Sequence, residues 1–311
     1  MLMTFTIIFT VCFVLIKLLP IDMSTVPIGE DANKIKATME ARGYFKPIPE
    51  QFYLYIKRIF QGDFGIGVNM PQYRNRAVWD VFTEKLPPTI LINVYSSLIA
   101  VPTGIALGIL AALKKNSRAD YFISTITMVA ISVPSFVYAF LVQYFLCFKL
   151  GWFPLQLEFG TDWFAPEMFK SMVPAILSLS FGTIAGFTRT TRAELTEVLT
   201  NDFMLLARTK GLTKAQATIR HAMKNCMVVV LPGIFGSFIG ILGGSLIIEG
   251  IFGVPGVGGL TLKAITGANG VDYDFFMLST CFYTFIGLAG GVVVDISYGF
   301  IDPRIRMGSK K

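Results

Sequence analysis

The sequence predicts an all-α membrane protein with six transmembrane helices. Of its 311 residues, 53% are hydrophobic, only 15% are charged, and the mean hydropathy is +0.62. A soluble domain carries about 25% charged residues. The uncharged residues also gather in runs, several of which reach the roughly 20 helical residues that cross the hydrocarbon of a bilayer. Because backbone polar groups in lipid must be paired within their own segment, each run is predicted to be helical.

Six such runs follow one another along the chain, which is treated as a single domain, residues 1–311. The first is short and is the weakest of the six. It has neither a preceding basic residue nor a small-residue cleavage site, so we expect a membrane anchor rather than a cleaved signal peptide. The predicted spans are residues 1–19, 86–113, 121–148, 171–188, 226–248 and 275–294.

Charge predicts the orientation of these spans. Lysine and arginine gather in the loops after the second, fourth and sixth spans. The positive-inside rule puts those loops in the cytoplasm, and both termini with them. The excess of 27 basic over 20 acidic residues is therefore attributed to topology and to contact with membrane lipid. No basic stripe with interleaved aromatic residues lies outside these loops, so nucleic-acid binding is not expected.

Two loops are longer than a connection requires. One is the external segment 20–85, and the other is the cytoplasmic segment 189–225. Within the external segment, apolar spacing predicts a short amphipathic helix that lies on the membrane or against a partner. The residues that give this spacing include Phe52, Tyr53, Tyr55, Ile59 and Phe60.

Glycines in the predicted spans recur at a small-xxx-small spacing, which lets helix backbones approach closely. Packing within the chain is the simpler explanation for each set. The sets are Gly104 with Gly108, Gly182 with Gly186, Gly236 with Gly240 and Gly244, and Gly287 with Gly291.

The motifs of autonomous catalysis are missing. The sequence has no GxxxxGK[ST] phosphate loop, no HExxH and no GxSxG, and it holds one histidine; we therefore expect no catalytic residue, metal or cofactor in this chain. No charged residue sits in the middle of a predicted span, which disfavours an ion-coupled transporter. If the protein moves a solute, the energy should come from another subunit. The four scattered cysteines, Cys12, Cys147, Cys226 and Cys281, are expected to be buried hydrophobes.

The cytoplasmic loop contains the signals of a short helix. Asn201 or Asp202 can cap its N-terminus, and Arg208 and Lys210 suit the last turn, where cations favour the helix dipole. Gly211 fits the position after the helix, where φ is often positive. The segment is predicted to be a helix of about nine residues, roughly 13 Å long.

A second helix is predicted directly after this glycine. Thr213-x-x-Gln216 has the spacing of a capping box and starts a helix that leads to the fifth span. The first helix contains the run 203–206, Phe-Met-Leu-Leu, which is more apolar than an exposed helix needs. It therefore fits either a groove on a cytoplasmic partner or a lid packed on the protein's own membrane face. The residues alone favour neither.

A glycine-rich segment, Gly253–Gly259, follows the fifth span on the external side. A dinucleotide site would need such glycines between a strand and a helix, so we expect a surface or re-entrant turn instead. Val257, within this turn, is expected to be accessible to an impermeant thiol reagent once it is replaced by cysteine.

These segments resemble one family. Ala207-x-x-x-Gly211 followed by Leu212 resembles the EAA loop of permeases of binding-protein-dependent ABC importers, without the family's leading glutamate. Asp202-Phe203 stands where oligopeptide and dipeptide importers often have Asp-Tyr. Arg220-His221-Ala222-x-x-Asn225 resembles their continuation. Other similar segments are 61–65, 78–81, 86–89, 132–136, 150–154, 249–258 and 295–304. The basic leader of the family is absent.

The resemblance implies a permease subunit of an oligopeptide or dipeptide importer in a bacterial or archaeal cytoplasmic membrane. Its implied partners are a second homologous permease, two ABC ATPase subunits that hold ATP and Mg, and an external solute-binding lipoprotein or periplasmic protein. ATPase coupling is implied for Asp202, Phe203, Ala207, Lys210, Gly211, Leu212, Arg220 and Asn225. A place near the external mouth of the pathway is implied for Glu249, Phe252, Gly253, Pro255, Gly256 and Gly258.

Other functions remain open from the sequence. The same kind of importer could take another solute, such as a nickel chelate, glutathione or a sugar, because a binding protein does most of the selection. A membrane scaffold or receptor that transports nothing is a different class, and dependence on an ATPase would distinguish it. An autonomous membrane enzyme is disfavoured by the missing catalytic groups. The peptide length, the pathway-lining residues and the choice between nutrition and signalling do not follow from the sequence.

Overall fold

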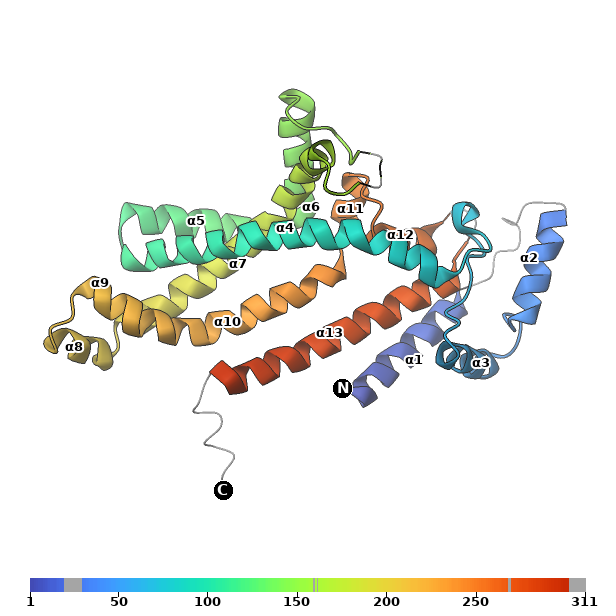
Figure 1. Cartoon of the computed structure of the whole chain (residues 1–311), viewed down its shortest axis with the longest axis horizontal. Helices are drawn as coiled ribbons and strands as arrows, with labels where there is room; N and C mark the ends of the chain where they lie inside the picture. Colours follow the sequence, from blue (N-terminus) through green and yellow to red (C-terminus); the bar gives the residue numbers. More distant parts are fainter. Residues whose placement is uncertain (20–29, 159, 161, 268–269, 302–311) are drawn as a thin grey trace, which may run out of the picture. The chain divides into compact units, whose positions relative to one another are not determined.

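The computed structural model describes residues 1–19, 30–158, 160, 162–267 and 270–301, which are almost entirely helical (Figure 1). Within these ranges no β-strand forms; two isolated bridges join Ile66 to Ala77 and Gly67 to Arg74. The all-α class is confirmed. The segment 20–29 of the predicted external loop and the C-terminal residues 302–311 lie outside the described residues.

Among the residues that the structure describes, four helices are long and apolar enough to cross a membrane, and a bent pair of helices supplies a fifth candidate. A further apolar helix, α1, has 17 residues. The number of six spans therefore stays a prediction. The four are α4 (Val78–Leu113), α7 (Pro166–Leu199), the continuous helix Lys214–Gly243 and α13 (Tyr273–Ile301); the pair is α5 (Arg118–Ser132) with the helix Ser135–Lys149, and α1 is Leu2–Leu18.

The third predicted span, 121–148, is not one straight helix. Its two halves meet at a bend of 103°. Val133 and Pro134 are extended at this point, with ψ of 127° and 144°. Proline disfavours the helical conformation in the residue before it, and it has no N–H to donate to the preceding turn. The second half comprises α6 (Ser135–Val142) and the π-helical η3 (Gln143–Lys149).

The fifth predicted span, 226–248, also has different limits. The helix begins at Lys214 and ends at Gly243, since Gly244 turns the chain with a φ of +57°. A six-residue helix, α11 (Leu246–Ile251), follows it. The glycine-rich segment then leads into α12 (Val257–Thr266), so the last three residues of the predicted surface turn are helical.

The described residues group into two units. The first comprises Met1–Thr89, Leu242–Gly250 and Val254–Leu288. Here α1 packs against α3 (Ile48–Phe60) and the start of α13 through the buried rings of Phe13, Tyr55 and Tyr273. The segment predicted to be external also contains α2 (Glu30–Ala41) and η2 (Pro71–Tyr73).

Helix α3 is the amphipathic helix predicted around residues 52–60. It buries Tyr55 against α1 and leaves Tyr53 and Phe60 exposed, at 64% and 87%. The partner or surface that this exposed face meets stays a prediction.

A buried carboxylate joins the extended segment before α4 to the start of α13 in this unit. One oxygen of Asp272 accepts the backbone N–H groups of Val68, Asn69 and Met70 at 2.9, 2.9 and 3.2 Å. Burial raises the pKa of Asp272 to about 6, although these three donors oppose the rise. Nothing in the local sequence indicated this contact.

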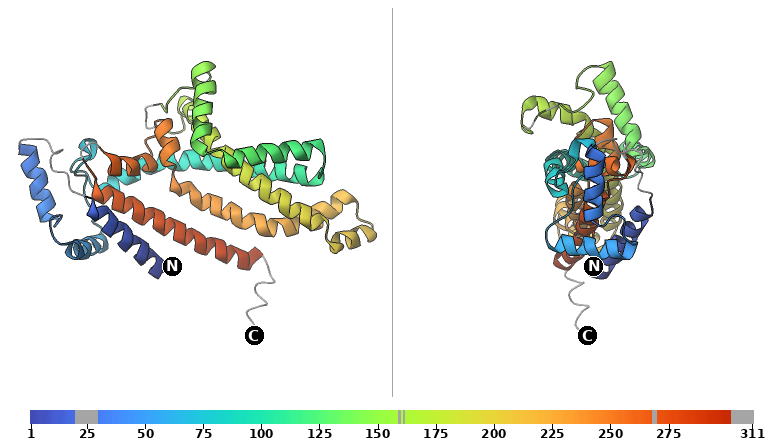
Figure 2. Two further views of the ribbon diagram at one scale, coloured as in Figure 1. Left: turned by 180° about the vertical axis from the view of Figure 1, so that it is seen from behind. Right: turned by 90° about the vertical axis from the view of Figure 1, so that its right-hand side faces the viewer.

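The second unit comprises Ile90–Ile241, Ile251–Gly253 and Ala289–Lys311. Its central helix is α7, which contacts α5, α6 and α10 (Met223–Gly240) and passes between α5 and α10 in Figure 2. A β-carbon on Gly104 would lie 2.7 Å from the Ile184 carbonyl oxygen, and one on Gly108 would lie 2.6 Å from Cβ of Thr191. These glycines therefore let α4 and α7 touch, as predicted. The pairs Gly182/Gly186 and Gly287/Gly291 meet no described atom within 4 Å.

Candidate functional site

The predicted coupling segment forms the short helix α8, Asp202–Thr209. Asn201 occupies the N-cap position, but its side chain makes no capping hydrogen bond. Gly211 has a φ of +88°, as the sequence predicts. The N–H of Leu212 reaches back to the carbonyl of Ala207 at 3.3 Å, and this bond closes the turn after the helix.

The capping box at Thr213 is also confirmed. The Thr213 hydroxyl accepts the Gln216 N–H at 3.3 Å, and the Gln216 side chain accepts the Thr213 N–H at 3.0 Å. The helix that starts here, α9 (Lys214–Ala217), continues through the π-helical η4 (Thr218–Ala222) into α10. The turn is thus fixed to a long helix without an intervening loop.

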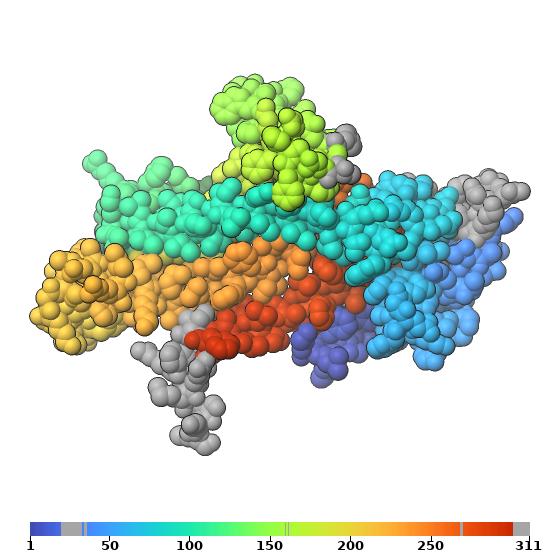
Figure 3. Space-filling view, in the orientation of Figure 1, coloured from blue at the N-terminus to red at the C-terminus, as the bar shows by residue number. Residues whose placement is uncertain are grey.

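The two faces of α8 differ in burial. Met204 and Ala207 are each 6% exposed and belong to a buried cluster. Leu205 and Leu206 are 64% and 55% exposed, and the yellow-orange atoms of α8 and α9 are uncovered in Figure 3. A lid on the protein's own surface would account for the first pair and not for the second. The other members of the cluster are Ala112, Leu195, Val198, Ala217, Ala222, Cys226 and Val230.

The remaining predicted coupling residues lie on α8, in the turn at Gly211 or after it. Asp202, Phe203, Lys210 and Gly211 are exposed, and Leu212 is half-buried. Arg220 and Asn225 are exposed further along the same helix, where the Asn225 amide donates to the His221 carbonyl at 2.9 Å. Beside α8 lies a cavity of about 520 Å³. Its lining includes Leu113, Lys115, Asp202, Leu205, Arg208 and Lys214.

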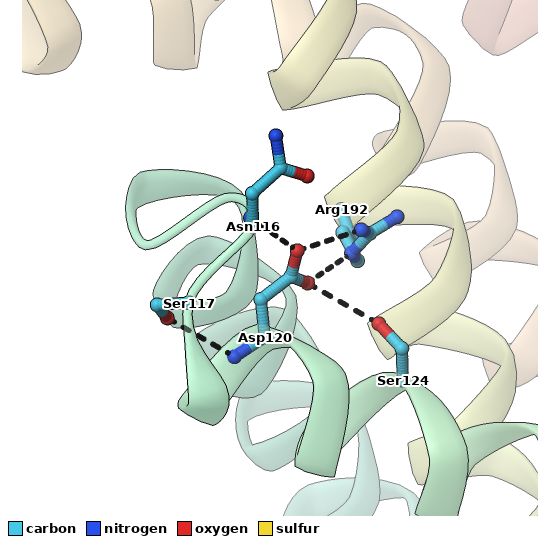
Figure 4. A network of polar contacts seen from close by, with 5 residues as sticks. All are labelled: Asn116, Ser117, Asp120, Ser124 and Arg192. Atoms are coloured by element: carbon cyan, nitrogen blue, oxygen red, sulfur yellow. Dashed lines mark hydrogen bonds and ion pairs between the residues drawn. The ribbon is translucent and has the colours of Figure 1, made fainter.

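An ion pair near this segment was not predicted (Figure 4). The carboxylate of Asp120, at the start of α5, accepts Nε and Nη2 of Arg192, on α7, at 2.5 and 2.9 Å. The same carboxylate accepts the Asn116 N–H at 2.9 Å and the Ser124 hydroxyl at 3.2 Å. The Ser117 hydroxyl caps α5 by accepting the Asp120 N–H at 3.3 Å. Ser117-x-x-Asp120 is a visible capping signal, but a partner 72 residues away is not.

In the predicted external turn, Glu249 is a buried anchor. The residue is only 4% exposed. Its carboxylate accepts hydrogen bonds from the Thr89 hydroxyl and from the Gly259 N–H, both at 2.9 Å. The Thr89 oxygen in turn accepts the Val257 N–H at 3.0 Å. Burial raises the pKa of Glu249, and its hydrogen bonds oppose that rise. The first turn of α12 is therefore held by a carboxylate at its N-terminus.

The glycines of this turn give the backbone room to surround that carboxylate. A β-carbon on Gly256 would lie 2.4 Å from the Thr89 oxygen and 2.5 Å from Glu249, and one on Gly258 would lie 2.8 Å from Glu249. Pro255 is exposed. Val257 is 0% exposed, so the expectation that a cysteine there would be accessible is wrong. Its side chain is required in the core between α4, α12 and α13.

Phe252 and Gly253 belong to the second unit and are not part of the Glu249 arrangement. Phe252 is 1% exposed, and its carbonyl accepts the Leu157 N–H at 2.8 Å. Gly253 has a φ of +65°. Of the six predicted external residues, the structure thus brings Glu249, Gly256 and Gly258 into contact.

The sequence of the chain is similar to that of known proteins. The family described as "Binding-protein-dependent transport system inner membrane component" matches residues 104–307. The chain is 33% identical to the oligopeptide transport system permease protein OppB of Salmonella typhimurium over 97% of this chain and 95% of that protein. It is 31% identical to the dipeptide transport system permease protein DppB of Bacillus subtilis over 99% and 95%.

Solved structures share the fold at lower identity. A chain of the inward-facing MetNI methionine ABC transporter aligns with a TM-score of 0.56 and 14% identity, covering 72% of this chain and 97% of that one. A chain of an amino acid ABC transporter aligns with a TM-score of 0.52 and 17% identity, covering 71% and 94%. These alignments describe the fold alone.

Proposed function

The chain belongs to the binding-protein-dependent transport system inner membrane components, and from this premise we propose how it works as the permease subunit of an ATP-driven peptide importer. The assignment to peptides rests on the permeases OppB and DppB, which match nearly the whole chain. It is a multi-pass protein of the cytoplasmic membrane. Its transport depends on ATPase and substrate-binding protein partners.

We assign the contact with an ATPase to α8. The observation that carries this assignment is the pair Leu205 and Leu206, which are apolar and exposed while the opposite face of the same helix is buried. Exposed apolar side chains on a short, capped helix fit a groove on another protein. Asp202, Phe203, Lys210 and Gly211 are exposed around them and would form the rest of the contact.

The two long helices on either side of α8 would transmit its movement. The buried face of α8 packs against α7, and the turn after it leads directly into the helix Lys214–Gly243. We propose that two ATPases hold ATP and Mg, that their closure pushes α8, and that a second, homologous permease completes the pathway. Both termini and the α8 loop would then be cytoplasmic, in agreement with the concentration of basic residues in these loops.

Co-purification tests this function directly. The tagged chain is extracted gently from its native membranes, and its companions are identified by mass spectrometry. We expect a second six-span permease and ATPases with a GxxxxGK[ST] motif. Recovery of the chain alone, under conditions that preserve other membrane complexes, would contradict the importer.

Thiol labelling in intact cells tests the orientation. In a chain whose four native cysteines are replaced by serine, Pro255→Cys should react with an impermeant maleimide, because Pro255 is exposed in the turn proposed to be external. Val257→Cys, two residues away and 0% exposed, is the matched control and should stay unlabelled. Labelling of Pro255→Cys only after the cells are opened would place this turn in the cytoplasm.

A further inference from the structure

We propose that Asp120 and Arg192 form a positioning pair that makes α5 move with the coupling segment α8. The inference rests on the proposed function of α8. It concerns α5, which contributes no described residue to the buried cluster around α8.

The apolar core around α8 does not include α5. The buried cluster that holds Met204 and Ala207 takes its other members from α4, α7, α9, η4 and α10. The half-buried residues packed against this cluster come from the same elements and from the turn at Leu212, and none of them is a described residue of α5. A displacement of α8 therefore passes through apolar packing to α4, α7 and α10, and it reaches α5 through the contact of α5 with α7.

The ion pair is the polar part of the α5–α7 contact, and its geometry is specific. The Asp120 side chain is 1% exposed and that of Arg192 is 34% exposed. Arg192 donates two hydrogen bonds, one to each carboxylate oxygen, and each oxygen accepts one more donor, from Ser124 or Asn116. A bidentate pair fixes the orientation as well as the distance of its partners. The carboxylate is so buried that removing the guanidinium would leave a charge without adequate compensation.

Arg192 lies where α7 can act as a rigid carrier. It is seven residues before the last residue of α7, Leu199, and α8 begins at Asp202. The Thr188 hydroxyl donates a hydrogen bond to the Gly104 carbonyl at 3.1 Å. A β-carbon on Gly108 would lie 3.1 Å from the backbone nitrogen of Arg192. The backbones of α4 and α7 therefore touch on one side of Arg192, while its guanidinium holds α5 on the other.

The pair also borders a space that would change if α5 and α7 moved apart. A cavity of about 460 Å³ lies between these helices, and Arg192 is part of its lining. Ser124, Thr127 and Thr188 are among the other residues that line this cavity. With the pair intact, α5 follows α7 and the cavity keeps its width. Without the pair, α5 still packs on α7, but its orientation is no longer fixed and it can slide or tilt against α7.

The experiment uses the complete importer, with its ATPases and binding protein, in proteoliposomes. Peptide uptake and ATP hydrolysis are measured on the same preparation for the wild type, Arg192→Gln and Arg192→Lys. Arg192→Lys keeps the charge but loses the bidentate geometry. We expect both variants to assemble and to hydrolyse ATP. Peptide uptake per ATP hydrolysed should fall about tenfold in Arg192→Gln, an effect of the size that typical coupling free energies produce. It should fall less in Arg192→Lys.

Ser117→Ala is the matched structural control, because it removes the α5 cap and leaves the ion pair intact. It should lower thermal stability without changing uptake per ATP. If Arg192→Gln fails to assemble, Arg192→Lys alone decides the question. Wild-type uptake per ATP in every Arg192 variant that assembles would overturn the inference, as would an equal loss in Ser117→Ala.

A separate variant distinguishes this inference from the proposed function of α8. Leu205→Ser with Leu206→Ser should release the ATPases, whereas Arg192→Gln should retain them. If the leucine variant keeps its ATPases and full uptake, the function of α8 itself is wrong. If only the leucine variant has an effect, α8 is the coupling helix and the Asp120–Arg192 pair is not its link to α5.

Discussion

The α8 turn and the Glu249 turn both join long apolar helices, but they are stabilised in opposite ways. Each lies between long apolar helices, and each reverses the chain with the help of glycines. The α8 turn leaves Leu205 and Leu206 exposed and satisfies its polar groups with a local capping box. The Glu249 turn buries a carboxylate and satisfies it from Thr89 and Gly259. The first depends on another molecule for its apolar surface, and the second is complete within the chain.

The glycines express this difference most clearly. Gly211 has a φ of +88° and no described atom within 4 Å of a β-carbon, so a side chain there strains the backbone without a collision. Gly256 has a φ of −94°, which any residue can adopt, yet a β-carbon would collide with Thr89 and Glu249. One glycine is required by conformation and the other by packing. Substitutions at the two should therefore fail for different reasons.

The largest effect is expected for Gly256→Val. Its side chain would displace Thr89 and Glu249 from each other, which combines overpacking with buried polar groups that lose their partners, at a cost of about 3 kcal/mol or more. The thermal unfolding midpoint of the purified chain in detergent should fall strongly. Gly250→Ala, which meets no described atom within 4 Å, is the control and should change it little. A Gly256→Val chain as stable as the control would show that this turn is less tightly packed than described.

Gly211→Val should abolish uptake while the protein stays in the membrane. A β-branched residue is strained at positive φ by about 1–2 kcal/mol, which would distort α8 without removing any core contact. Peptide uptake and the amount of chain in membrane fractions are measured together. Gly211→Asn is the control, since asparagine tolerates this conformation and should retain most activity. Normal uptake by Gly211→Val would remove the need for this turn geometry.

Exchanging Leu205 and Leu206 for serine should weaken the partner contact without destabilising the chain. Exposed side chains contribute little to folding, and we expect a change within about 0.5 kcal/mol. ATPase recovered with the tagged chain should fall several-fold. The double methionine variant keeps an apolar surface and should retain the ATPase. Equal recovery with serine and with methionine would mean that the apolar character of this face is not what the partner recognises.

The smallest effect is a pH dependence of the Glu249 turn. Because burial raises the pKa of Glu249 above its ordinary value of 4.5, the folded chain holds its proton at pH values where the unfolded chain has lost it. Stability should therefore fall as the pH rises through the interval above 4.5. Glu249→Gln, which cannot ionise, should remove this contribution. The comparison is the unfolding midpoint against pH for both chains, and parallel curves would contradict the raised pKa.

Local signals were predictable and distant contacts were not. Gly211 and the Thr213–Gln216 box were correct because the residues involved are neighbours in sequence. The long apolar helices followed from composition alone. Asp120 and Arg192, or Asp272 and the amides of Val68–Met70, are brought together by tertiary packing over 72 and about 200 residues, and such pairing leaves no periodic trace. The prediction for Val257 was wrong because its glycine-rich neighbours suggested an exposed turn. In the structure the backbone of these glycines packs around the buried carboxylate of Glu249, and Val257 is buried with them.

The helix Lys214–Gly243 has one further consequence. Its 30 residues correspond to about 45 Å at ~1.5 Å per residue, while the hydrocarbon of a bilayer is only about 30 Å thick. An upright helix would leave roughly a third of its length beyond the lipid tails, and a tilted helix would leave less. Its first residues would then cross the headgroup layer, about 40–45 Å being the thickness of a bilayer with its headgroups, and would hold the Gly211 turn at the membrane surface, within reach of a large globular neighbour.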